Sequence, residues 1–423
     1  MVADLCAWWA AEGLEPALLT EAPDDPSWGQ FQPDIPKRIQ ALAAEPGRVR
    51  AGFAELTSRS LMESSAGSWS MHRMTAAALR HLQAERGDAD TAKPAAALLS
   101  AVYPGGSRGV HLSENWPLCA RLTPHVRALW ASGAAPETEA MDYLFNQAAI
   151  YLGKIADFPG GVEMARASLV LKQKRLPEAH RDIAVGFDNL GIALMRAGEV
   201  KESELHLARA VELHETHRPD SMDLAGSYDL HGRVMYEQAL AGDAAALIRS
   251  LRRQQQALAL CRRLAAHDSE ETARMLNNLA VVRDRQGRTA AAARLSAAAL
   301  AIHRRVLDPG DANLGHSLMN TGSYWLKSGA ATEAEPLLRE ALQLWQTVFA
   351  AQPQHPDTRG VADWLISCLL TLARAGDRPD ARRVEARALC DRYGFDFDRE
   401  VEHARQFPLQ PPEAWAAGAG PVR

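Results

Sequence analysis

The chain has 423 residues, a formal net charge of −5 and a hydrophobic content of 47%, with only 6% aromatic residues. Its five cysteines are scattered and form no Cys-x-x-Cys pair, which argues against a disulfide framework or a structural zinc site and favours a reducing compartment. No apolar run approaches the roughly 20 residues that span a bilayer, and Asp4 and Glu12 interrupt the first apolar stretch, so no signal peptide is evident. We therefore expect a cytoplasmic protein with no membrane partner.

The first 90 residues are predicted to form a small domain that does not share the periodicity of the rest. Residues 60–64 and 68–72 each alternate apolar and polar side chains on either side of Ser-Ala-Gly, which indicates a β-hairpin. Helices followed by a small hairpin suggest a winged helix. Short helical patterns occupy residues 39–44, 49–58 and 74–83.

From about residue 140 to residue 395 one helical pattern recurs. Residues 182–191, 271–280 and 313–322 share their apolar spacing, and each is followed seven residues later by a glycine. Looser copies end at two further glycines, so that the steps between glycines are 42 to 47 residues. A period of this size predicts a stack of helix pairs, each of which buries its apolar face against its neighbours. The turn glycines are Gly198, Gly242, Gly287, Gly329 and Gly376.

Small residues also recur, five and twelve residues after the turn glycine in four units, where they let two helices cross closely. This register resembles the tetratricopeptide-repeat family, and the long period is similar to the repeats of kinesin light chains. HEAT-type repeats have the right length but lack this register. The resemblance implies an all-α fold, with a tetratricopeptide-repeat superhelix of five to six helix pairs. The small residues are Ser203, Ala210, Ala292, Ala299, Ala334, Ala341, Ala381 and Ala388.

The segments 53–63 and 69–74 resemble the winged-helix part of bacterial STAND-type signalling NTPases with an NB-ARC core. In that family the winged-helix segment ends in a Met-His-Asp-like motif, and the His of this motif senses the bound nucleotide. The resemblance gives this role to His72 when an NTPase domain is supplied, although Arg73 stands where the family has Asp. Residues 95–125 contain stretches that resemble the bridging helices of members with tetratricopeptide C-termini.

The sequence contains no Gly-x-x-x-x-Gly-Lys-Ser/Thr, so the backbone amides and Mg²⁺ ligand that phosphoryl transfer needs are missing. We therefore expect no enzyme activity and no cofactor. Met1 falls where the family's nucleotide domain would already have ended. The resemblance therefore implies either a C-terminal fragment, with a P-loop NTPase domain in cis, or a shortened protein that lost its NTPase domain or uses one in trans. The expected domains are a winged-helix-like domain (1–90), bridging helices (91–140), the repeats (141–395) and a partly disordered C-terminal segment (396–423).

An asparagine recurs at the sixth position of the first helix in four repeats. In the tetratricopeptide family this position lines the concave groove, where an amide can hydrogen bond a peptide backbone with both donor and acceptor. The alternative is that asparagine merely suits a solvated groove. We predict peptide-groove binding for Asn146, Asn189, Asn278 and Asn320.

A basic residue stands two positions before four of the turn glycines. These cations are predicted to line the groove and to bind acidic groups of a partner. Alternatively, cations near a helix C-terminus offset the macrodipole and hydrogen bond the last carbonyls, and this explanation needs no ligand. Both interpretations stay open for Arg196, Arg285, Lys327 and Arg374.

Residues 244–310 are basic, with twelve Arg against five Asp or Glu. Such a stripe suits nucleic acid or an acidic peptide, but it contains no aromatic residue to stack on bases. The pair His214 and His217 lacks the spacing of a His-Glu-x-x-His metal motif, so no metal site is expected there.

The expected function is a non-enzymatic sensor or scaffold that binds a protein or peptide in the repeat groove and regulates a STAND-type NTPase. A free-standing interaction adaptor is the alternative, in which the N-terminal domain only caps the solenoid. A nucleic-acid-binding regulator ranks third.

Overall fold

The computed structural model describes residues 1–20, 32–86, 91–105, 109–110, 112–133, 135–264, 269–350 and 352–410. Residues 411–423, part of the C-terminal segment expected to be partly disordered, lie outside this part. The chain divides into two compact units, Met1–Ala197 and Gly198–Arg423, and each is described by itself. Within the described residues no helix is both long enough and apolar enough to cross a membrane.

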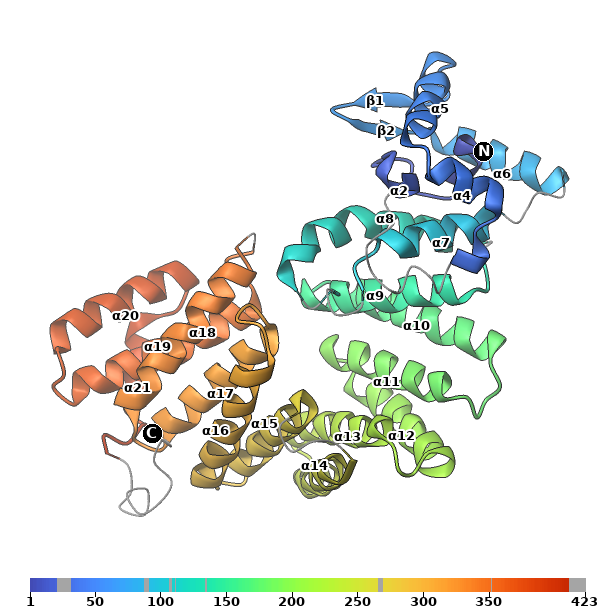
Figure 1. Cartoon of the computed structure of the whole chain (residues 1–423). Helices are drawn as coiled ribbons and strands as arrows, with labels where there is room; N and C mark the ends of the chain where they lie inside the picture. Colours follow the sequence, from blue (N-terminus) through green and yellow to red (C-terminus); the bar gives the residue numbers. More distant parts are fainter. Residues whose placement is uncertain are drawn as a thin grey trace. The chain divides into compact units, whose positions relative to one another are not determined.

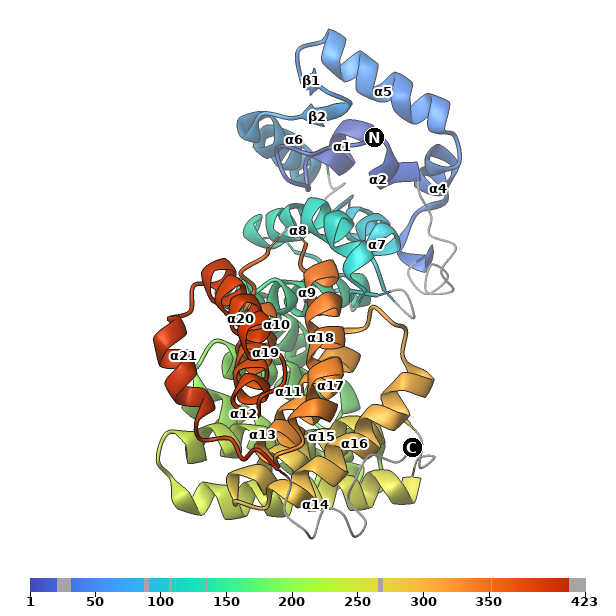
Figure 2. The ribbon, with the colours of Figure 1, turned by 90° about the vertical axis from the view of Figure 1, so that its left-hand side faces the viewer.

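The first unit begins with short helices around a two-stranded sheet, as Figure 2 shows for α1, α5 and α6 beside β1 and β2. Strands β1 and β2 are antiparallel, and their turn residues Ala66 and Gly67 have φ angles of 51° and 84°, as a tight hairpin turn requires. The predicted hairpin is therefore present. These elements are α1 (Val2–Cys6), α2 (Ala17–Thr20), η1 (Gln32–Asp34), α4 (Lys37–Ala43), α5 (Pro46–Ser58), β1 (Glu63–Ser65), β2 (Ser68–Ser70) and α6 (Arg73–Glu85).

Aromatic residues join the hairpin to these helices. Trp69 on β2 exchanges backbone hydrogen bonds with Leu14, and its ring lies 5.1 Å from that of Phe53 on α5. Near α1, the Trp8 indole donates to Gln83 at the end of α6 and to Thr91, at 3.1 and 2.9 Å. The hairpin and its flanking helices therefore share one core.

The rest of the first unit is a stack of longer helices (Figure 1). Helix α7 packs on α8 and α9, and α10 lies between α9 and α11. Between α9 and α10, the buried carboxylate of Asp142 accepts hydrogen bonds from Ser168, at 2.6 Å, and from the ammonium group of Lys172. The elements are α7 (Ala92–Val102), η4 (Ser113–Asn115), α8 (Trp116–Ala131), α9 (Glu139–Lys154), α10 (Phe158–Arg175) and α11 (Arg181–Arg196).

The second unit consists of helices in which each packs on the next along the chain. The first helices of successive pairs, α13, α15, α17 and α19, also contact one another, so they form one layer and their partners form another. Its helices are α12 (Val200–His217), α13 (Met222–Leu240), α14 (Ala244–Leu264), α15 (Glu270–Arg285), α16 (Thr289–Val306), α17 (Ala312–Lys327), α18 (Ala331–Val348), α19 (Pro356–Arg374), α20 (Pro379–Tyr393) and α21 (Phe397–Ala404).

All five predicted turn glycines have positive φ angles, between 75° and 108°, which other residues rarely adopt. Small residues at the crossings are also needed, because a Cβ on Gly322 of α17 would lie 2.7 Å from Leu338 of α18. The repeat architecture predicted from the sequence is confirmed.

The prediction that the small residues five and twelve positions after the turn glycine lie at the helix crossing is wrong for α20. Ala381 and Ala388, expected at the crossing, are exposed. Helices α12, α16 and α18 begin two residues after their turn glycines, whereas α20 begins three residues after Gly376. The extra residue, Arg378, has a φ of 46°, and one added residue turns the helix face by about 100°. The buried positions therefore move by one residue, and Arg382 is buried instead.

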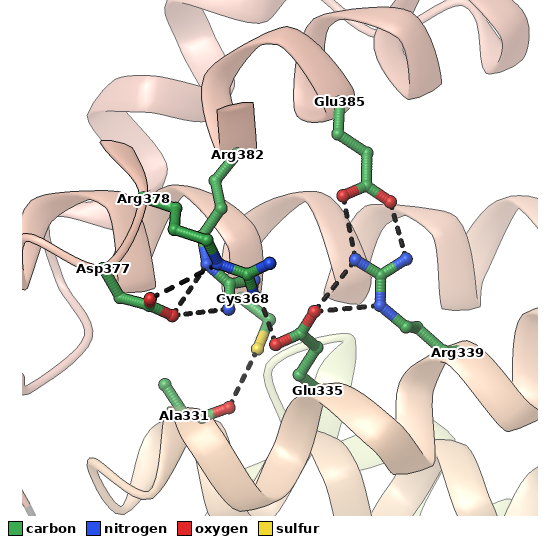
Figure 3. A network of polar contacts seen from close by, with 8 residues as sticks. All are labelled: Ala331, Glu335, Arg339, Cys368, Asp377, Arg378, Arg382 and Glu385. Carbon is green, nitrogen blue, oxygen red and sulfur yellow. Dashed lines mark hydrogen bonds and ion pairs between the residues drawn. The ribbon is translucent and has the colours of Figure 1, made fainter. Parts of the chain in front are cut away.

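A network of charged side chains joins α18 to α20 around that buried arginine (Figure 3). Arg382 is 5% exposed and contacts Glu335 at 2.9 Å and Asp377 at 3.0 Å. Arg339 reaches the same Glu335 at 2.8 Å and binds Glu385 with two hydrogen bonds, at 2.6 and 2.8 Å. Glu335 therefore forms ion pairs with two arginines, Arg382 and Arg339. Burial alone would raise its pKa, but the two guanidinium groups lower it below its usual value.

Candidate functional site

In the first unit a small pocket opens between α9, α10 and α11. Two of the predicted asparagines meet there, because Asn189 on α11 donates from Nδ2 to Oδ1 of Asn146 on α9, at 2.7 Å. Arg196, at the end of α11, lies at the pocket beside Gly153. A Cβ on Gly153 would lie 2.8 Å from the guanidinium, so a larger residue there would displace it.

The lining of this pocket is mostly apolar, with polar groups contributed by the asparagines and Arg196. Within the described residues, the amide nitrogen of Asn146 and the side-chain oxygen of Asn189 have no hydrogen-bond partner. One donor and one acceptor are the pair that a peptide group needs. The residues lining the pocket are Asn146, Ala149, Ile150, Gly153, Phe158, Gly161, Asn189, Ile192, Ala193 and Arg196.

The predicted residues of the second unit have different surroundings. Asn278 on α15 donates to Asp229 on α13 at 2.7 Å, and that fully buried carboxylate also pairs with Arg274. The side chain of Asn320 is partly exposed and has no hydrogen-bond partner within the described part of the chain. Asn278 therefore hydrogen bonds a buried carboxylate between two first helices, while Asn320 keeps its amide available.

The basic residues before the turn glycines also differ. Arg374 donates to the carbonyl oxygens of Ala404 and Phe407, so it holds the end of α21 and is used within the fold. Arg285 is exposed at the end of α15. Lys327 pairs with Asp284 at 2.5 Å.

An aromatic cluster beside Lys327 was missed by sequence reasoning. The ammonium group lies 5.7 Å from the ring of Tyr324 and 5.2 Å from that of Trp364, on α17 and α19. Burial raises the pKa of Tyr324, and the carboxylate of Asp284 adds to this, so the phenol stays neutral. These residues come from three first helices, and no spacing within one repeat shows that they meet.

The predicted nucleotide sensor is exposed at the start of α6. The Nδ1 atom of His72 accepts a hydrogen bond from the backbone N–H of Met74 at 3.2 Å, which caps the helix. Its neighbour Arg73 lines a second pocket with Arg80, whose guanidinium lies 5.8 Å from the ring of Trp8. The His72 imidazole is therefore accessible and has a local structural role.

The repeats match a known family directly. Residues 272–313 and 314–357 match the tetratricopeptide repeat. The chain contains tetratricopeptide repeats. A comparison with curated proteins finds no match.

Several solved structures are similar. A Podosopora anserina protein, described as a kinesin light chain with nearly identical TPR-like repeats, is 16% identical, with a TM-score of 0.37, over 48% of this chain and 94% of that chain. BtubC from P. vanneervenii is 19% identical, with a TM-score of 0.40, over 57% and 93%. A STAND protein with a tetratricopeptide repeat sensor, from Pyrococcus horikoshii, is 12% identical, with a TM-score of 0.43, over 96% of this chain and 62% of that chain.

Proposed function

We propose that the chain is a non-enzymatic scaffold that binds an extended, acidic peptide segment of a partner protein in the pocket between α9, α10 and α11. The amide nitrogen of Asn146 and the side-chain oxygen of Asn189, which have no partner among the described residues, support this most directly, because they match the acceptor and donor of one peptide group. Arg196 supplies a positive charge at the same pocket for an acidic side chain or a C-terminal carboxylate.

The composition of the pocket lining favours binding over catalysis. Among the described residues that line it there is no Ser, Cys, His, Asp or Glu, so they offer neither a nucleophile nor a general base. Its apolar side chains, among them Ile150, Phe158 and Ile192, suit the side chains of a bound segment.

Peptide selection tests this proposal. A random peptide library would be selected on the full chain, and the recovered peptides would be measured against Asn189→Ala and Arg196→Ala. Each variant should weaken binding by roughly tenfold, since each removes about 1–2 kcal/mol of hydrogen bonding or charge pairing. The control is Lys201→Ala, an exposed cation on α12 outside the pocket, which should bind as the wild type does. Selected peptides that bind all three variants equally would place the binding site elsewhere.

We further propose that the N-terminal elements relay peptide binding to a STAND-type NTPase domain in cis or in trans. The hairpin between α5 and α6 and the exposed His72 support this, together with the motif resemblance of residues 53–74. The mass of the protein in its own cells, with its N-terminal sequence, shows whether an NTPase domain is attached. If none is attached and none co-purifies, the adaptor function is favoured.

Two variants separate sensing from folding at His72. His72→Asn keeps a side chain that can cap α6, whereas His72→Ala removes the cap. If His72 senses nucleotide, both variants should change the ATPase response of the associated domain, while only His72→Ala lowers stability. A response that follows stability alone would contradict the sensor role.

A nucleic-acid-binding function is less favoured because acidic side chains pair with several arginines of the basic stripe. Arg263 pairs with Asp220, and Arg304 pairs with Glu340 at 2.6 Å. Nucleic-acid binding that weakens steeply with salt would reverse this ranking.

We also propose a cytoplasmic location, which is consistent with five free, buried cysteines.

A further inference from the structure

The C-terminal helix α21 is attached to α19 by several polar and aromatic contacts. The Arg374 guanidinium on α19 donates to the carbonyl oxygen of Ala404, the last residue of α21. The Oγ atom of Ser367 on α19 also lies 3.2 Å from Nδ1 of His403 on α21. The rings of Trp364 and Phe407 lie 6.1 Å apart at the same contact. The face of α21 that carries His403 is therefore turned toward α19.

Three potential metal ligands meet at this contact. Asp363 belongs to α19, while Glu400 and His403 belong to α21, three residues apart and so on one face of the helix. One ligand atom from each lies within 4.8 Å of the others. Three donors from two helices therefore lie close enough together to bind one metal ion.

One oxygen of the Glu400 carboxylate lacks a partner in the described part of the chain. The residue is only 7% exposed, and its Oε2 atom is buried without a hydrogen-bond partner among the residues that the structure describes. Nδ1 of His403 lies 3.7 Å from that oxygen, too far for a hydrogen bond. The Asp363 carboxylate lies beside that of Glu400, and two carboxylates in one poorly hydrated place repel each other. At neutral pH a cation there would remove both penalties.

We propose that Asp363, Glu400 and His403 bind a divalent transition-metal ion of the Zn²⁺ type, which ties α21 to α19. An imidazole nitrogen with two carboxylate oxygens suits Zn²⁺, whereas Mg²⁺ and Ca²⁺ prefer oxygen ligands alone. Three protein ligands leave a fourth tetrahedral position for water. Bound metal stabilises the folded C-terminal helices, because the ligands come together only when α21 is in place.

This proposal does not depend on peptide binding by the first unit. The competing explanation is that Asp363 and Glu400 share a proton and bind no metal. The two explanations differ at neutral pH, because only the first predicts that metal binding depends on these three side chains together.

Titration of the chelator-treated full chain with Zn²⁺ and with Co²⁺ at pH 7.5 tests the site. One Zn²⁺ should bind per chain. The visible absorption of bound Co²⁺ should show a low-coordinate complex with nitrogen and oxygen ligands. Glu400→Gln keeps the shape of the side chain and should weaken binding by about 100-fold or more. Asp363→Asn provides a second variant should the first fold poorly.

The matched control is Glu402→Gln, an exposed carboxylate on the same helix that pairs with Arg405. It should bind metal as the wild type does. Equal binding to the wild type, Glu400→Gln and Asp363→Asn would assign the metal to another place and overturn the proposal. Absence of Zn²⁺ binding to the wild type, or of any Zn²⁺-dependent rise in its unfolding temperature, would favour the shared proton and overturn it as well.

Discussion

Replacing Glu335 by alanine tests how much the buried charges contribute to the contact between α18 and α20. In the network of Figure 3 this carboxylate contacts both Arg382 and Arg339. The side chain of Arg382 is 6% exposed and that of Glu335 is 15% exposed, so water replaces the lost partner poorly. After the substitution Arg382 keeps only Asp377 as a charged partner in the network, and the carboxylate of Asp377 is exposed to solvent.

The expected cost follows from this burial. Removing one partner of a buried ion pair costs about 3–5 kcal/mol, because the other charge stays in the interior. Since Asp377 still pairs with Arg382, we expect a smaller loss for Glu335→Ala, of about 2–4 kcal/mol. The loss should be confined to the C-terminal helices, because each repeat is stabilised mainly by its neighbours.

Native-state hydrogen exchange gives this local free energy directly. A loss of about 2–4 kcal/mol corresponds to roughly 30- to 1,000-fold faster exchange of the protected amides in α20. Amides of α13 and α14, at the other end of the same unit, should change little. The thermal unfolding temperature of the full chain is a weaker measure, because repeat arrays unfold in parts.

The control is Glu385→Ala, which removes the other carboxylate of Arg339. That pair has the better geometry, with two parallel hydrogen bonds, but its side chains are 42% and 40% exposed. We expect a cost of at most about 1 kcal/mol. If Glu385→Ala destabilised α20 as much as Glu335→Ala, burial would not be the deciding factor, and the reasoning would be refuted.

Four further substitutions test other parts of the fold. Gly287→Ala should destabilise by about 1–2 kcal/mol in urea unfolding, because Gly287 has a φ of 75°; Gly226→Ala, within α13 and with open space around its Cβ, should instead stabilise by about 0.5–1 kcal/mol. Burial lowers the pKa of His125 from 6.5 to about 4, so its contribution to stability is complete above pH 6.5 and is lost as pH falls toward 4. Between pH 7 and 4.5 the wild type should lose about 2–3 kcal/mol more than His125→Gln does, and equal losses would exclude His125 as the cause. Lys172→Ala should cost about 3–5 kcal/mol by leaving Asp142 buried without a cation, and a cost below 1 kcal/mol would show that water reaches that carboxylate.

The repeat architecture could be predicted because its determinants are local. Gly198 and Gly329 occupy turns with positive φ, and the helix pairs follow from apolar spacing within some 40 residues. The hairpin of β1 and β2 could also be predicted, since its two strands and its Ala66-Gly67 turn are adjacent in the chain. The register of α20 could not, because the left-handed conformation of Arg378 is not visible in its residue type.

The contacts of the candidate site residues could be predicted only in part. The sequence selected Asn146 and Asn189 by their shared place in the repeat, and the structure brings them together because α9 and α11 are neighbours. A second position rule, two residues before a turn glycine, selected Arg374, yet that side chain binds the carbonyl of Ala404 at the end of α21. Sequence position therefore identifies which face a residue occupies, but not which group it meets there.

Backbone conformation and helix faces depend on residues close together in the chain, so the sequence alone determined the helix pairs, their turns and the hairpin of this protein. The meeting of Asp363 with Glu400 and His403 depends on how α21 returns to α19, about 40 residues later. The sharing of Glu335 by two arginines depends on a one-residue change in a turn. Only the tertiary structure decided these contacts, because ion pairs and ligand sets require distances of a few ångströms between segments whose separation no local pattern encodes.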